Sequence, residues 1–260
     1  MSECISITIA VPNYNNIATI TETLKSLENQ TCKNFRIVIS DNHSSDSSKS
    51  IIENWCRDKK NCSLISPDKH LTYVEHLMFM VKSVNSKYVV FLAGDDILSD
   101  NFVKLSNKIV ANADELNAIF YRSENFIDSE KKTVRKRFTE RCSKKIRYRS
   151  LNSPLGNISG NVYNSNFVKT LFNDKNEIRT CGNCIDHYLC VKATEGRYLT
   201  SNYIGIKYRV HQGSWGGNKR RLMSQHHIKF LREYLKHELN LVEKIILNRR
   251  LLISYLHSIF

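Results

Sequence analysis

Short apolar runs alternate with helical stripes along the first part of the chain, and this alternation restricts the fold more than any other feature. The runs rich in β-branched residues, which we read as strands, are Ile5–Val11, Phe35–Ser40, Cys62–Ser66 and Tyr88–Ala93. Between them, apolar residues recur at helical spacing within residues 17–27, 51–55 and 71–84. Helical crossovers between short buried strands require a parallel sheet with helices on both faces. The sequence therefore predicts an α/β fold with a mostly parallel sheet.

Polar clusters follow these strands where each of them ends. They are Pro12–Asn16, Asp41–Asp46 and Gly94–Asp96. Ligands of such sheets bind beyond the carboxyl ends of the strands. We therefore expect the clusters to meet at one edge of the sheet and to form a site there.

The most informative cluster is the acidic pair Asp95–Asp96, which comes directly after the apolar run Tyr88–Ala93. Two adjacent carboxylates at the end of a buried strand are costly unless a cation meets them, and a divalent metal held by one or two carboxylates commonly carries a substrate phosphate. The alternative is a plain turn, for which Gly-Asp-Asp is also suitable. No Gly-x-Gly-x-x-Gly or Walker-type loop is present, so a bound diphosphate would depend on a cation for neutralisation.

The charge of the chain predicts an anionic partner. Its 260 residues include 39 Lys and Arg against 25 Asp and Glu, which gives a net charge of +14. Residues 131–149 hold ten of the basic residues and one acid, and a solvated hairpin or mobile loop is the simplest structure for them. A nucleic-acid-binding module is an alternative, but the basic residues are not interleaved with stacking aromatic residues as in RNA-binding patterns.

The cysteines are expected to be free thiols in a reducing cytosol, because the N-terminus resembles no signal peptide and no apolar stretch reaches transmembrane length. The spacing of Cys181 and Cys184 also suits a zinc knuckle or a redox pair, although no second well-spaced pair accompanies it.

The second half of the chain is less regular. We expect strands at 117–121, 158–163 and 203–211, a short helix near 167–172, and a helix over 185–193 that carries Asp186 in its first turn. From residue 218 onward the composition shifts to Lys and Arg with Leu and Ile, which predicts two amphipathic helices with a break near Asn240 or Asn248. These helices either pack on the domain or lie on an anionic membrane.

Three segments, Ile9–Asn15, Ile39–Asp46 and Phe91–Asp96, in this order and spacing, resemble the family 2 inverting glycosyltransferases of GT-A fold. The bacterial enzymes that build O-antigen or other surface-polysaccharide repeats are the most similar. The resemblance implies a Rossmann-like GT-A domain over residues 1–217, with a nucleotide-sugar half at 1–100 and an acceptor half at 101–217. The basic helical tail then covers residues 218–260.

The resemblance also implies roles for individual residues. The expected nucleotide-binding residues are Pro12, Asn13, Tyr14, Asp41, Gly94 and Asp95, and Asp41 would contact the uracil. Asp95 is the expected ligand of Mn²⁺ or Mg²⁺, although the first acid of the family's Asp-x-Asp motif is replaced by Ala93. Asp96, Arg209 and His211 are expected near the sugar and diphosphate, with His211 a second metal ligand. Asp186 is the expected catalytic base, and Asp174, Glu177 and Glu195 are the alternatives to it.

The function implied is transfer of a hexose, most simply glucose or galactose, from a UDP-sugar to a polyprenyl-diphosphate-linked saccharide during O-antigen or surface-polysaccharide synthesis. The expected location is the cytoplasmic face of an anionic membrane, with no nucleic-acid partner. A sugar-nucleotide-binding or nucleic-acid-binding protein without transferase activity is the alternative.

Overall fold

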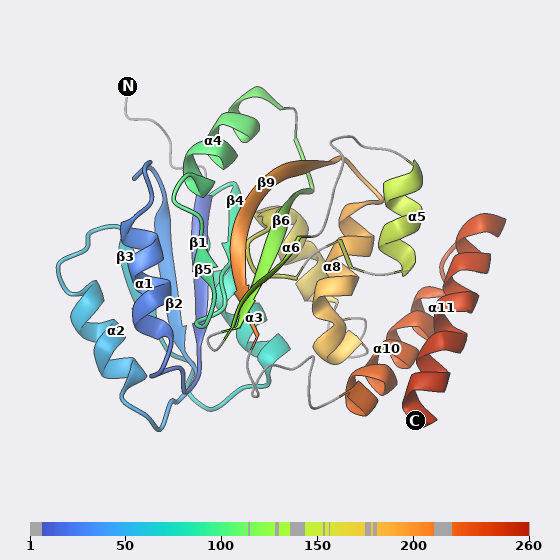
Figure 1. Cartoon of the computed structure of the whole chain (residues 1–260), viewed down its shortest axis with the longest axis horizontal. Coiled ribbons are helices and arrows are strands. Elements are labelled where there is room, and N and C mark those ends of the chain that lie inside the picture. Colours follow the sequence, from blue (N-terminus) through green and yellow to red (C-terminus); the bar gives the residue numbers. More distant parts are fainter. Residues whose placement is uncertain are drawn as a thin grey trace.

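The computed structural model describes residues 7–113, 115–127, 130–135, 144–152, 154–155, 157–174, 178, 181–210 and 220–259. In these residues a single mixed sheet runs through the molecule in the order β3-β2-β1-β4-β8-β6-β9-β5, and β7 pairs with β6 (Figure 1). Its strands are β1 (Ile7–Asn13), β2 (Arg36–Asp41), β3 (Cys62–Ile65), β4 (Tyr88–Phe91), β5 (Ile97–Leu98), β6 (Ala118–Ile127), β7 (Glu130–Arg135), β8 (Val162–Asn164) and β9 (Tyr198–Arg209).

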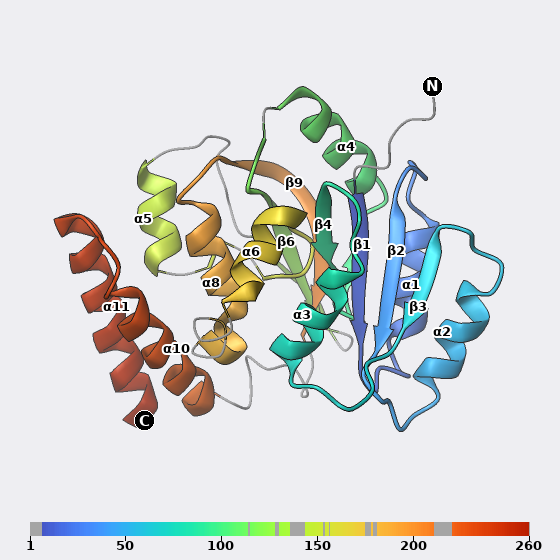
Figure 2. The same ribbon diagram turned by 180° about the vertical axis from the view of Figure 1, so that it is seen from behind.

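The helices between and after these strands cover both faces of the sheet (Figures 1 and 2). They are α1 (Ile20–Glu28), α2 (Ser48–Cys56), α3 (Tyr73–Lys82), α4 (Phe102–Asn112), α5 (Lys144–Asn152), α6 (Ser165–Asn173), α8 (Ile185–Ala193), α10 (Arg220–Tyr234) and α11 (Leu241–Ile259), with the 3-10 turn η1 (Gly182–Cys184) before α8. Among the described residues, no helix has both the length and the apolar character needed to cross a membrane.

The first four strands confirm the predicted parallel arrangement. β1 pairs in parallel with β2 and with β4, and β2 pairs in parallel with β3. Side chains alternate between the faces: Ile7, Ile9 and Val11 of β1 pack with α1, α2 and α4, whereas Ala10 packs on the side of α3. Both faces are covered, so β1 and β4 are buried along their whole length, as their apolar runs indicate.

The second half of the sheet departs from a purely parallel order. β8 is inserted antiparallel between β4 and β6, and β9 returns parallel to β6. Gly160, before β8, has φ of +77°, and an added Cβ would lie 2.7 Å from Cβ of Ile206. Gly160 is therefore closely packed, because the side chain of Ile206 in β9 lies against its backbone.

The basic segment 131–149 contains both regular and undescribed structure. Its first residues form β7, which makes the expected hairpin with β6. Residues 136–143 lie outside the described part of the chain, and α5 follows as a helix that the sequence did not predict. Arg147 joins α5 to α8, α10 and α11 through hydrogen bonds to Val191, Tyr234 and Glu243.

The two C-terminal helices form as expected, and Asn240 marks the break between them. Its side chain accepts a 3.0 Å hydrogen bond from the N–H of Glu243 at the start of α11, whereas Asn248 lies inside that helix. Phe230, Leu231 and Tyr234 of α10 enter the same core as α3, α6 and α8. The tail is therefore packed on the domain through one face, while α11 keeps an exposed apolar face.

Candidate active site

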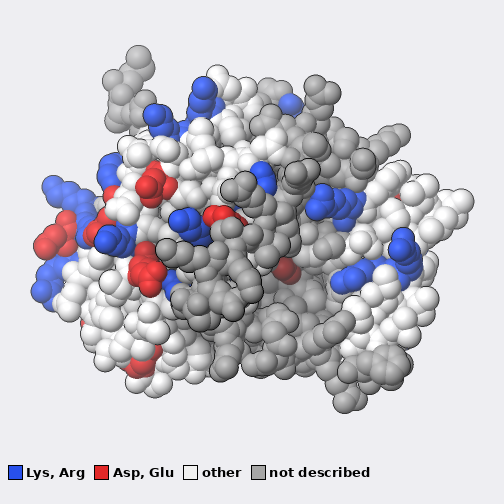
Figure 3. Space-filling view, viewed as in Figure 1, with Lys and Arg blue, Asp and Glu red and all other residues white. Residues whose placement is uncertain are grey.

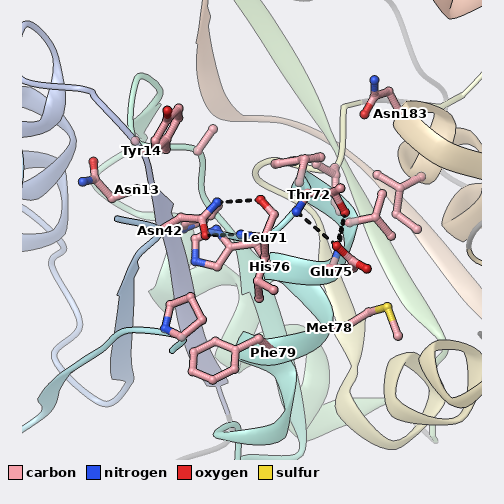
Figure 4. A pocket seen from close by; sticks show the side chains of 18 of the residues that line it. Asn13, Tyr14, Asn42, Leu71, Thr72, Glu75, His76, Met78, Phe79 and Asn183 are labelled. Atoms are coloured by element: carbon pink, nitrogen blue, oxygen red, sulfur yellow. Dashed lines mark hydrogen bonds between the residues drawn. The ribbon is translucent and has the colours of Figure 1, made fainter. Parts of the chain in front are cut away.

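A cavity of about 1700 Å³ opens where β1 and β4 end and α3 and α8 begin. Its walls come from separate parts of the chain: the loop after β1, residues 67–72 before α3, the Gly94–Asp96 turn, and the start of α8. The predicted site residues that line it are Pro12, Asn13, Tyr14, Gly94, Asp95, Asp96 and Asp186. In Figure 4, Tyr14 and Asn13 lie on one side of the start of α3 and Asn183, near Asp186, lies on the other. The clusters after β1 and β4 thus converge on one cavity, together with Asn42 from the cluster after β2.

Asn13 links the first two strand ends beneath the cavity. Its Nδ2 donates to Oδ1 of Asp41 at 2.8 Å and to Oγ of Ser48 at 3.0 Å. Asp41 also accepts hydrogen bonds from the N–H and hydroxyl of Ser44, at 3.1 and 2.6 Å. Asp41 is therefore buried behind Asn13, next to a smaller cavity of about 280 Å³, and its neighbour Asn42 lines the large cavity instead. The uracil contact predicted for Asp41 remains a prediction.

Residues 67–72 form a wall of the cavity that sequence reasoning did not identify. Asn42 holds this segment through both ends of its amide: Nδ2 donates to the carbonyl of Leu71 and Oδ1 accepts from the N–H of Leu71, each at 2.9 Å (Figure 4). Nδ1 of His70 donates to the carbonyl of Asn42 at 3.0 Å. The rings of Tyr14 and His70 lie 4.6 Å apart between centroids. The signal that could have located the segment is its position directly after the short strand β3.

Asp96 is fully buried at the lip of the sheet. Its Oδ1 accepts a 3.0 Å hydrogen bond from the N–H of Arg209, whereas Oδ2 receives no hydrogen bond from the described residues. Burial, and then the neighbouring charge of Asp95, raise the pKa of Asp96 to about 7, against the opposing effects of Ser159 and Arg209. An acceptor oxygen left without a donor beside a second carboxylate is the environment that a cation would stabilise.

Arg209, the last residue of β9, stabilises the acidic turn. Its Nε donates to the backbone carbonyl of Asp95 and its Nη2 to Oε2 of Glu22, both at 2.9 Å. The guanidinium also lies 4.6 Å from the ring centroid of Phe126. Arg209 is only 3% exposed, so in this structure its charge supports the turn that carries Asp95. The diphosphate contact predicted for it remains a prediction.

The carboxylates of the acidic turn are suitable ligands for a divalent cation. Asp95 and Asp96 both line the cavity and supply carboxylate oxygens, one of them unsatisfied. The described residues hold no cluster of three His, Cys, Asp or Glu side chains suited to a metal. His211, the second ligand expected from the sequence, lies outside the described residues.

Asp186 lies in the first turn of α8, which begins at Ile185 as predicted. Burial raises the pKa of Tyr208 to about 12, with further contributions from the charges of Asp96, Asp95 and Asp186. Tyr73, at the start of α3, has its pKa raised by burial and by the charges of the same acids. Both phenols and all three carboxylates line the same cavity, and the charges of all three acids contribute to the raised pKa of each phenol.

The alternative bases are placed less favourably. Glu195 accepts a hydrogen bond from the hydroxyl of Tyr234, and its Oε1 lies 3.7 Å from Arg147, away from the cavity lining. Asp174 follows α6 and does not line the cavity, and Glu177 lies outside the described residues. Cys181 and Cys184, which suited a zinc knuckle, are buried thiols that form no disulfide among the described residues.

Comparisons with known proteins agree with this architecture. The model of the family described as "Glycosyl transferase family 2" matches residues 8–163, more than half of the chain. An "Uncharacterized glycosyltransferase" of Rickettsia bellii (strain RML369-C) is 27% identical over 158 residues, which cover 60% of this chain and 20% of that protein. The chain therefore spans only a small part of this curated relative.

Solved structures show the same fold at low sequence identity. The crystal structure of S. aureus TarS has a TM-score of 0.69 at 16% identity, covering 96% of this chain and 43% of that one. TarS 1-349 in complex with UDP-GlcNAc gives 0.68 at 15% identity, with coverages of 97% and 72%. The mannosyltransferase PcManGT from Pyrobaculum calidifontis, in complex with GDP-Man and Mn²⁺, gives 0.64 at 14% identity, with coverages of 98% and 74%.

The acidic turn after β4 and the cavity at the carboxyl edge of the sheet are thus found in a chain that matches the family over residues 8–163, which include β1 to β7. By this match the protein belongs to glycosyltransferase family 2, and its curled sheet with helices on both faces is the GT-A fold.

Proposed function

We propose that the protein is a metal-dependent inverting glycosyltransferase that moves a hexose from a UDP-sugar to a hydroxyl group of a polyprenyl-diphosphate-linked saccharide. The observation that carries the proposal is the convergence of Asp95, Asp96 and Asp186 on one cavity whose other end is lined by Tyr14 and His70. Its family membership supports the transfer of a sugar, and solved neighbours contain UDP-GlcNAc or GDP-Man with Mn²⁺.

In this proposal the nucleotide occupies the end of the cavity formed by the loop after β1 and residues 67–72. The aromatic rings of Tyr14 and His70 would contact the base, and Asn42 keeps His70 and Leu71 in place through its hydrogen bonds. The sugar then lies between the acidic turn and Asp186, where the phenols of Tyr73 and Tyr208 also face the cavity.

Asp95 and Asp96 would hold Mn²⁺ or Mg²⁺ against the diphosphate, with His211 as a further ligand. Bound there, the cation would neutralise the charge of the leaving nucleotide as a Lewis acid. Arg209 keeps the backbone of the acidic turn in position through Asp95, so the carboxylates would bind the cation without rearrangement.

Asp186 is the proposed general base. It accepts the proton of the acceptor hydroxyl while the hydroxyl oxygen forms a bond to the anomeric carbon and the bond from that carbon to the diphosphate breaks. One base and no protein nucleophile give a single displacement, so the configuration of the sugar inverts.

The acceptor and the location are proposed from charge and from α11. A saccharide on polyprenyl diphosphate is anionic and membrane-bound, and it would suit a protein with a net charge of +14 in O-antigen or surface-polysaccharide synthesis. The outward residues of α11 include Leu241, Ile245, Leu252 and Leu256, all exposed, with Lys244 and Arg249 exposed beside them. On the face shown in Figure 3, Lys and Arg outnumber Asp and Glu at the end that carries α5, α10 and α11. These features support contact with the anionic cytoplasmic face of a membrane.

The experiment that tests the proposed function is a donor screen. UDP-glucose, UDP-galactose, UDP-N-acetylglucosamine and GDP-mannose are each added with Mn²⁺, and the melting temperature and release of free nucleotide are measured. A UDP-sugar should raise the melting temperature and release UDP faster when a lipid-diphosphate-linked saccharide is supplied. Binding without any nucleotide release, with or without acceptor, would instead favour a sugar-nucleotide-binding protein.

A further inference from the structure

Helix α10 places two consecutive histidines on the segment that carries Asp186. His226 contacts η1, which ends two residues before Asp186, and His227 contacts His187, directly after it. The two side chains therefore hold the backbone on both sides of the acid, from a helix that lies beyond the residues matched by the family model.

The ring of His226 packs flat against the backbone of η1. A Cβ added at Gly182 would lie 3.1 Å from Cγ and Nδ1 of His226, and Gly182 has φ of +48°. This left-handed conformation suits glycine, and the absence of a side chain lets the imidazole approach the turn closely. Nδ1 of His226 also accepts a long hydrogen bond of 3.4 Å from the N–H of Asn183.

The turn needs such external support. Neither Cys181, before η1, nor Cys184, before α8, caps its helix with a side-chain hydrogen bond. His226 supplies an acceptor to one of the N–H groups at this helix start and covers the turn with its ring.

On the other side of Asp186, the hydrogen bonds form a directed chain through α8, α10 and α11. Nε2 of His187 donates to the carbonyl of Ser150 at 2.7 Å, so its Nδ1 is the acceptor for Nε2–H of His227, also at 2.7 Å. Nδ1 of His227 then accepts from the hydroxyl of Ser254 at 3.1 Å. Both imidazoles are buried and neutral in this arrangement, so α10 is fixed relative to α8.

We infer that His226 is a positioning residue for Asp186: its ring fixes η1 so that the carboxylate at the start of α8 faces the cavity. The inference rests on the proposed function, in which Asp186 is the base. His226 and Asn183 line the same cavity as Asp186, so α10 forms part of the wall of the candidate active site.

The test compares His226→Ala with His226→Asn, whose amide oxygen can take the place of Nδ1, and with Gln225→Ala at an exposed position of the same helix. In donor turnover with UDP-sugar and Mn²⁺, His226→Ala should lower kcat about 10-fold to 100-fold and leave the KM for the donor within about twofold, because a displaced base slows the chemical step without changing donor contacts. His226→Asn should recover most of kcat, and Gln225→Ala should behave as wild type.

Hydrogen exchange gives a second readout that needs no substrate. Amides 183–187 should exchange at least about 10-fold faster in His226→Ala, while amides of β1 and β4 keep their wild-type rates. Unchanged exchange in this segment would overturn the inference. A second result would also overturn it: His226→Asn loses as much kcat as His226→Ala, although amides 183–187 of His226→Asn exchange as in wild type. His226 would then act by direct contact with the substrate. If wild type releases no nucleotide from any donor, the proposed function fails, and hydrogen exchange still decides whether His226 holds the turn.

Discussion

The backbone N–H of Arg209 donates a 3.0 Å hydrogen bond to Oδ1 of Asp96, which joins the end of β9 to the acidic turn after β4. The other oxygen of the same carboxyl is buried and receives no hydrogen bond from the described residues. Asp96 is thus fixed in orientation by one oxygen and left unsatisfied at the other, which is how a protein prepares a carboxylate for a cation.

Asp96→Asn should therefore weaken binding of Mn²⁺ in the presence of UDP by at least about 10-fold, since an outer partner or ligand of a metal typically contributes this much. Isothermal titration with Mn²⁺ and UDP measures it, and Asp100→Asn, at a nearby exposed position, should bind as wild type. At pH 8 the urea midpoint of Asp96→Asn should be no lower than that of wild type. The substitution removes a carboxylate whose charged form is disfavoured by burial and by the charge of Asp95. Equal Mn²⁺ affinity in both variants would remove Asp96 from the metal site.

Asp186→Asn should lower kcat by about 10²-fold to 10⁴-fold, the usual contribution of a positioned general base. The increase in melting temperature caused by UDP and Mn²⁺ should remain as in wild type, because the substitution keeps the shape of the side chain and leaves the acidic turn intact. Asp174→Asn, which alters an acid away from the cavity, is the matched control. Wild-type turnover in Asp186→Asn would show that another group accepts the proton.

The buried histidine pair predicts a loss of stability in mild acid. Burial lowers the pKa of His187 to about 4 and, together with the charges of His187 and Arg250, that of His227 to about 2. Since free histidine has a pKa near 6.5, the unfolded chain takes up protons first, and stability falls as the pH drops below about 6.5.

By this relation His187 alone should contribute a loss of roughly 2 kcal/mol between pH 7.5 and pH 5. Urea unfolding at the two pH values measures it. His187→Gln should start from a lower stability at pH 7.5 but show a smaller difference between the two pH values. His237→Gln, at an exposed position, should show the wild-type difference. A difference that is the same in wild type and His187→Gln contradicts the prediction.

Arg147 should be essential for the packing of the C-terminal helices. Its Nε donates to Oε1 of Glu243 at 3.1 Å, its Nη1 to the carbonyl of Val191 at 2.6 Å, and its Nη2 to the hydroxyl of Tyr234 at 3.0 Å. Arg147→Ala would leave the largely buried Glu243 carboxylate, whose side chain is 13% exposed, without its cation, so we expect a loss of about 3 kcal/mol in the free energy of unfolding.

Urea unfolding measures this loss, and Lys49→Ala is the control. Lys49 is paired with Glu53 at 4.0 Å with both side chains about half exposed, so its removal should change stability by less than about 0.5 kcal/mol. If the two substitutions cost the same, the contacts of Arg147 contribute no more than a surface ion pair.

The outward face of α11 predicts binding to anionic vesicles. Leu252→Glu should reduce partitioning onto vesicles that contain phosphatidylglycerol by about 10-fold, because burial of one leucine contributes about 1.5 kcal/mol or more and the new charge is repelled. Sedimentation with vesicles measures it. Ile17→Glu, which alters an exposed apolar residue outside α11, should partition as wild type. Equal partitioning of the two variants would assign the exposed face of α11 no role in membrane contact.

The arrangement of β1 to β4 could be predicted because the sequence signals for it are local. Each strand from β1 to β4 is a short apolar run with a polar cluster at its end, and a parallel sheet necessarily gathers such ends at one edge. For the same reason Asp95 and Asp96 line the cavity at this edge. Asp186 was placed at the start of α8, since apolar spacing alone indicated where that helix begins.

The sequence by itself therefore determined the α/β order, the acidic turn and the acid at the start of α8. Only the tertiary structure decided that β8 enters the sheet antiparallel, that Asp41 is covered by Asn13, and that His226 reaches the turn before Asp186. Each of these depends on a contact between segments far apart in the chain. Periodicity and turn-forming residues carry information only about neighbouring residues. Contacts between distant segments form only when the core packs and brings their backbones together.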